Sequence, residues 1–185
     1  MREDRTAKSE RQRALIERLA RWRVPLGFVC AIAVLYLALP TRRSLALGSA
    51  IAVIGELVRI WAAGHLEKGR EVTQSGPYRF MRHPLYAGSA IVAVGAAVAC
   101  AQISSAALIV SYMAITILAA VRHEEANMRT AFGDGYDAYL ESRSARVDRP
   151  FSLTRALSLN KEYKALLGLI ALVGILAVKV ALLTN

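Results

Sequence analysis

Long apolar blocks separated by short charged segments dominate the chain. Five such blocks occupy residues 24–39, 44–64, 85–100, 105–121 and 165–183. A helix needs about 20 predominantly apolar residues to cross the hydrocarbon core of a bilayer. The pattern therefore predicts an all-α integral membrane protein with five transmembrane helices. The third block is short for a span, so we expect its helix to begin near Arg82 or to lie where the functional site thins the protein.

Residues 1–23 are predicted to form a separate segment ahead of the membrane domain, which covers residues 24–185. Within this segment Leu15, Leu19 and Trp22 recur at the spacing of one helix face. This spacing predicts a basic amphipathic helix on the cytoplasmic membrane surface. The alternative is a charged tail that only sets the orientation of the protein.

The distribution of positive charge predicts how the chain is oriented. The formal net charge is +10, and residues 1–23, 64–84 and 122–164 hold 20 of the 24 Lys and Arg residues. Because Lys and Arg gather on the cytoplasmic side of membrane proteins, we expect the N-terminus and these segments there and the C-terminus outside. The same rule accounts for the excess of positive charge, so we do not expect the protein to bind nucleic acid.

Two polar clusters flank the hairpin of the third and fourth blocks. Residues 75–88 concentrate two prolines, two tyrosines, two arginines and a histidine, and residues 122–125 read Arg-His-Glu-Glu. The tight hairpin brings both clusters to one membrane face, so Arg82 and His83 should approach the glutamate pair. The alternative is that the glutamates form a solvated helix end and the tyrosines are interface anchors.

The second block contains two charged residues, Glu56 and Arg59. A charge inside a span costs about 2.5–3.5 kcal/mol on insertion scales and usually faces a polar cavity. Residues three apart share a helix face, so we expect these two to pair and Arg59 to face the functional site. A structural ion pair between helices is the alternative.

A metal site and a disulfide are not expected. The three histidines and the two adjacent glutamates do not have the spacing of a metal-ligand motif. Cys30 and Cys100 fall at different predicted depths in the membrane, which argues against a bond between them.

Several separated motifs resemble the isoprenylcysteine carboxyl methyltransferase family, which belongs to a wider group of membrane methyltransferases that includes phospholipid N-methyltransferases. The motifs cover roughly residues 56–140 and are, in order, Arg59-Ile60-Trp61-Ala62, Gly76-Pro77-Tyr78, Arg82-His83-Pro84-Leu85-Tyr86, Glu124-Glu125, Phe132-Gly133 and Tyr136-Asp137-Ala138-Tyr139. The five predicted spans agree with small microbial members, so we expect the inner or plasma membrane of a prokaryote. After Tyr139 the sequence departs from the family pattern, which leaves the acceptor open.

The resemblance implies S-adenosylmethionine as methyl donor, bound in a cytoplasmic site between the polar segment before the third span and the helix end after the fourth. It implies cofactor contacts from Tyr78, Arg82, His83, Leu85, Tyr86, Glu124 and Glu125. We also predict catalytic roles for Arg82, Glu125 and Arg59, and we expect Arg59, Arg143 and Arg146 to bind the acceptor, because an arginine can orient its carboxylate.

The expected function is therefore methylation of the carboxylate of a lipid-soluble acceptor such as an isoprenylcysteine. A carboxylate attacking a sulfonium methyl needs no general base, so alignment and exclusion of water would carry catalysis. Alternatives are a phospholipid amine N-methyltransferase, with His83 or His123 as base, an NADPH-dependent sterol-type reductase, and a non-enzymatic scaffold or transport protein. We expect a monomer, although the small residues of the third span would equally suit a homodimer.

Overall fold

The structure is a computed structural model that describes residues 25–134 and 148–184, and all regular secondary structure in these residues is helical. The predictions for residues 1–23, for Tyr136 to Tyr139 and for Arg143 and Arg146 lie outside the described residues. The helices are Pro25–Leu37, α2 (Arg42–His65), the 3-10 turn η1 (Gly76–Arg79), α3 (Pro84–Cys100), α4 (Ile103–Phe132), the π-type turn η2 (Arg155–Leu159) and α6 (Tyr163–Leu183).

Three of these helices, α2, α4 and α6, are long and apolar enough to cross a membrane. The chain is therefore an integral membrane protein, as the sequence predicted. Pro25–Leu37 and α3 are also apolar but shorter. At about 1.5 Å per residue, the 17 residues of α3 extend about 26 Å, less than the bilayer core of about 30 Å. Five spans thus remain a prediction, although all five apolar blocks are helical.

Local sequence signals explain where the helices begin and end. Thr41 and Ser44 form a reciprocal capping box at the start of α2, which satisfies two free backbone donors. Pro84 is the first residue of α3, a position where its missing N–H costs nothing. Ala101 ends α3 in the left-handed region, with φ of 49°. The start of α3 lies two residues from the start expected near Arg82.

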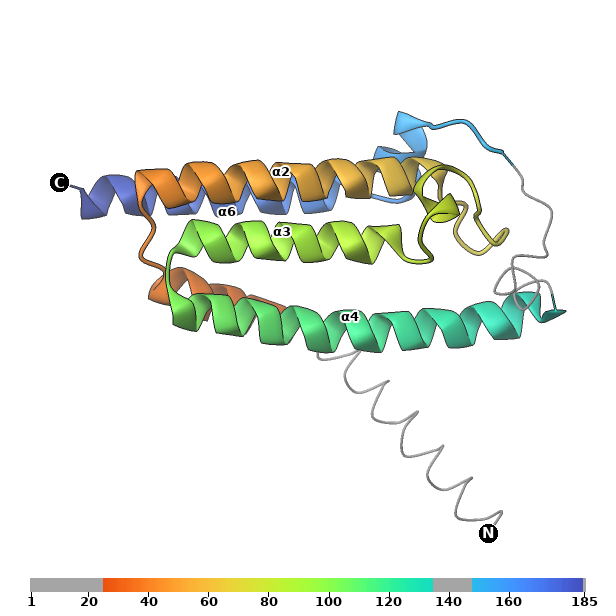
Figure 1. Ribbon diagram of the computed structural model, residues 1–185, viewed down its shortest axis with the longest axis horizontal. Helices are drawn as coiled ribbons and strands as arrows, with labels where there is room; N and C mark the ends of the chain where they lie inside the picture. The colour runs from red at the N-terminus through yellow and green to blue at the C-terminus, as the bar shows by residue number, and fades with distance from the viewer. Residues whose placement is uncertain (1–24, 135–147, 185) are drawn as a thin grey trace, which may run out of the picture.

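Glycines allow α2 and α3 to pack backbone against backbone. A Cβ atom on Gly55 of α2 would lie 2.7 Å from the carbonyl oxygen of Gly88 on α3, and one on Gly88 would lie 2.8 Å from the Gly55 oxygen. Figure 1 shows α3 between α2 and α4, with α6 running along α2. The prediction that the small residues of the third block permit a close helix approach is confirmed.

We expect Gly55→Leu to destabilise the protein by about 3 kcal/mol or more, because the new side chain meets backbone atoms that cannot move aside. Gly174→Leu is the matched control, since a Cβ at Gly174 of α6 meets nothing within 4 Å. Apparent unfolding temperatures of the two variants in detergent check this. Equal unfolding temperatures for the two variants would contradict the close packing of α2 and α3.

Both predicted polar clusters lie at one end of the bundle. Figure 1 shows the connector between α2 and α3, the C-terminal part of α4 and residues 148–162 gathered at this end. The turns after Leu37 and before Ile103 lie at the opposite end, where the Leu39 amide donates to the Cys100 carbonyl at 2.9 Å. The two clusters lie at the same end of the bundle because α3 and α4 run antiparallel. That this end faces the cytoplasm remains a prediction.

Candidate functional site

A small polar pocket lies between the α2–α3 connector, the start of α3 and the C-terminal part of α4. It encloses about 60 Å³. Four residues predicted to contact a cofactor line it, namely Tyr78, Arg82, His83 and Glu124. Its other charged lining residues are Glu67, Lys68 and Glu71, which the sequence had not singled out. Acids and bases thus converge on one concavity beside the apolar bundle.

His83 joins the two polar clusters. It precedes α3, and its Nε2 atom lies 3.4 Å from Glu125 Oε1 while its Nδ1 atom lies 3.8 Å from Glu124 Oε2. Its ring also packs against Tyr86, with centroids 5.7 Å apart. The prediction that His83 approaches the glutamate pair is confirmed. The nearby carboxylate of Glu124, with further support from that of Glu125, raises the pKa of His83 above its usual 6.5.

We predict that His83→Gln reduces stability most at acidic pH and progressively less as pH rises. A histidine whose pKa is raised by folding contributes stability that is fully present below its unfolded pKa, near 6.5, and that is lost as pH rises through its folded pKa. For partly exposed pairs the effect is up to about 1 kcal/mol. Chemical unfolding of both proteins across pH checks this. His123→Gln is the control, because His123 is exposed and its hydrogen bond within the described residues is to Asn127 on its own helix; a loss that does not change with pH would contradict the assignment.

The other predicted cofactor residues lie beside the pocket and not in its lining. Glu125 and Tyr86 each contact His83, which lines the pocket. Leu85 is half-buried, and its carbonyl accepts a hydrogen bond from Ser89 at 2.8 Å. Leu85, Tyr86 and Glu125 therefore do not line the pocket, and their contacts with a cofactor stay predictions.

Arg59 lies elsewhere, in the lining of a second cavity inside the bundle. Its guanidinium is 3.4 Å from Glu56 and 2.7 Å from Glu162, and it donates to Ser89. The predicted pairing with Glu56 is confirmed. Arg59 also ties α2 to Glu162, just before α6, as the alternative of an ion pair between helices predicted; its role in a functional site stays a prediction. It does not line the polar pocket.

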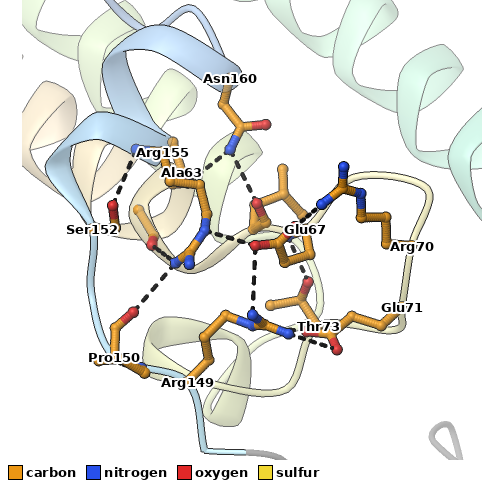
Figure 2. A network of polar contacts seen from close by, with 12 residues as sticks. Ala63, Glu67, Arg70, Glu71, Thr73, Arg149, Pro150, Ser152, Arg155 and Asn160 are labelled. Carbon is orange, nitrogen blue, oxygen red and sulfur yellow. Dashed lines mark hydrogen bonds and ion pairs between the residues drawn. The ribbon is translucent and has the colours of Figure 1, made fainter.

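A polar network fixes the connector wall of the pocket to residues 148–160. Figure 2 shows Arg149 and Arg155 converging on Glu67. Arg155 Nε lies 2.8 Å from Glu67, and Arg149 makes paired hydrogen bonds to Glu71 at 3.1 and 3.2 Å. Two arginines that follow the fourth helix thus hold both connector glutamates of the pocket.

The same network closes the C-terminal end of α2. Arg155 donates to the carbonyl of Gly64 at 2.6 Å, and Asn160 donates to those of Ala63 and Leu66 at 2.8 and 3.1 Å. The last carbonyls of a helix have no partner within the helix, so these side chains supply what the helix cannot. The sequence offered one signal for these residues, the spacing of Glu67 and Glu71 by four positions. Their partners, Arg155 and Arg149, lie too far along the chain to be inferred from that spacing.

Comparison with known proteins gives one family. A family model described as phospholipid methyltransferase matches residues 22–135. The match covers every residue that lines the polar pocket, and the network residues Arg149, Arg155 and Asn160 lie beyond it. No curated protein and no solved structure matches the chain.

Proposed function

Because the chain belongs to the phospholipid methyltransferase family and is thus a membrane methyltransferase, we propose that it moves a methyl group from S-adenosylmethionine to the head group of a membrane lipid. The observation that carries the proposal is the pocket at the end of the bundle. There His83 and Glu124 place polar chemistry directly beside membrane-spanning helices, so a water-soluble donor and a lipid acceptor can meet.

The charged groups of the pocket suit this cofactor. S-adenosylmethionine carries a carboxylate, an ammonium and a sulfonium. Arg82 is exposed and makes no ion pair with any residue in the described part of the chain, so it is available to bind the carboxylate. Glu124 would hold the ammonium or the ribose hydroxyls. The enclosed 60 Å³ equals about two water molecules, so binding requires the exposed pocket side chains to turn outward.

The chemistry asked of the protein is mainly positional. The cofactor supplies a methyl group bound to a sulfonium sulfur. When the methyl group is transferred, this sulfur becomes a neutral thioether, so no general acid is needed to protonate the leaving group. The residues of the pocket would align the reactants and exclude water. An amine acceptor must also lose a proton before its nitrogen bonds to the methyl carbon. His83 and Glu125 are the groups placed to accept that proton, whereas His123 is exposed.

An amine is the first candidate acceptor, because the family description names phospholipids and their common nucleophilic head group is an amine. The carboxylate of an acceptor such as an isoprenylcysteine is the second. The observation that favours it is Arg82, which lines the pocket without a described ion-pair partner and could orient a carboxylate.

The test is transfer of a radiolabelled methyl group from S-adenosylmethionine to extracted membrane lipids by the purified protein. We expect label in the lipid extract that mild base does not release as volatile methanol, because N-methyl bonds survive it, and loss of that label in Glu124→Gln. Label released as methanol would assign a methyl ester and thus the carboxylate acceptor. No labelled lipid with the folded wild-type protein would contradict the proposal.

A further inference from the structure

A second cavity occupies the interior of the bundle and plays no part in the pocket described above. It has a volume of about 640 Å³, and helix Pro25–Leu37, α2, α3, α4 and α6 all contribute to its walls. The lining is largely apolar, and its only charged members in the described chain are Glu56 and Arg59. A cavity of this kind within membrane helices suits a hydrocarbon chain with a polar group at one place.

The charges at this place do not balance. Arg59 lies between Glu56 and Glu162, so two carboxylates share one guanidinium. Glu56 is only 4% exposed, and its Oε1 atom is buried without a hydrogen-bond partner among residues 25–134 and 148–184. A buried acceptor without a partner costs about 1–3 kcal/mol, and more when charged. Glu56 Oε1 therefore lacks a hydrogen-bond donor, and Arg59 Nε is the other buried polar atom here without a hydrogen-bond partner among the described residues.

The size of the cavity limits what can fill it. At about 30 Å³ for each water-sized group, 640 Å³ accommodates about twenty methylene-sized groups. That is one long hydrocarbon chain and less than the two chains of a diacyl lipid. Ser89 of α3 contacts Arg59 and is six residues after His83. At about 1.5 Å per residue, the charged group of the cavity around Arg59 therefore lies about 9 Å along the helix direction from the polar pocket.

We propose that this cavity binds the acceptor lipid by a single hydrocarbon chain and that Glu56 Oε1 accepts a hydrogen bond from the acceptor's ammonium group before that group moves to the polar pocket for methyl transfer. The inference rests on the proposed function and deepens it. An ammonium supplies both the missing donor and the missing charge. A carboxylate would instead add a third negative charge beside one guanidinium, which opposes its binding.

Binding of octadecylamine and of octadecanoic acid to the full chain in detergent, without any methyl donor, tests the proposal. These probes share one chain and differ in head-group charge. We expect one octadecylamine to bind per protein, with an affinity about tenfold or more above that of the acid, a difference of about 1.4 kcal/mol. Glu56→Gln should remove the preference, because it leaves Arg59 and Glu162 as a balanced pair.

Two cavity variants keep the test independent of Glu56. Ala96 lines the cavity and Ala90 is exposed on the same helix. Ala96→Phe should abolish octadecylamine binding, and Ala90→Phe should not change it. Equal binding of amine and acid, or binding that survives both Glu56→Gln and Ala96→Phe, would mean non-selective lipid uptake and overturn the inference.

The two proposals fail in different experiments. Methyl transfer by the wild-type protein that is unaffected by Glu56→Gln and Ala96→Phe would remove only the cavity inference. Selective octadecylamine binding without methyl transfer would retain the cavity as an amine-lipid site and remove the proposed activity.

Discussion

Replacing Arg155 with methionine will lower the free energy of unfolding by about 3 kcal/mol or more. Arg155 binds Glu67 at 2.8 Å and the Gly64 carbonyl at 2.6 Å, and the side chains of both charged residues are about 15% exposed or less. Removing Arg155 leaves Glu67 with the longer contacts to Arg149 and Arg70, at 3.6 and 3.8 Å, and breaking a largely buried pair costs about 3–5 kcal/mol. The methionine keeps most of the apolar stem, so the loss reports on the guanidinium.

Arg70→Met is the matched control for this experiment. Arg70 approaches the same carboxylate, but at 3.8 Å and with 82% of its side chain exposed, so its loss should change stability by less than about 1 kcal/mol. Chemical unfolding in detergent measures both variants. Similar losses would show that Glu67 does not depend on Arg155, and the network would then not anchor the pocket wall.

Replacing Arg82 with alanine will weaken S-adenosylmethionine binding about tenfold to a hundredfold. A hydrogen bond to a charged group contributes about 1.5–3 kcal/mol, and Arg82 is the arginine in the pocket lining. Arg79→Ala is the control, because Arg79 lies three residues away and pairs with Asp148 at 2.6 Å outside the pocket. Equal affinities for the two variants would exclude Arg82 as the carboxylate-binding group.

The sequence predicts those parts of the structure that depend on local pattern. Each apolar block became a helix, because hydrophobic length and caps such as Thr41 act over a few residues. The approach of His83 to Glu125 was also predictable, since a tight hairpin fixes which helix ends meet. A spacing of three residues likewise sufficed for Glu56 and Arg59.

Contacts between distant segments were beyond the sequence pattern. Arg149 meets Glu71 across 78 positions, and Arg59 meets Glu162 across 103. The chain offers many basic residues near each glutamate, so charge alone cannot select the partner. These pairings decide that Arg59 belongs to the interior cavity and that Glu67 belongs to the polar pocket.

Calorimetric titration of S-adenosylmethionine into the detergent-purified protein tests the central claim most directly. We predict saturable binding to one site by the wild type, loss of that binding in Glu124→Gln, and none for NADPH. Asp148→Asn should bind as the wild type does, because Asp148 is a carboxylate at the same end of the bundle but outside the pocket. No binding by the folded wild type, or binding of NADPH alone, would contradict the account.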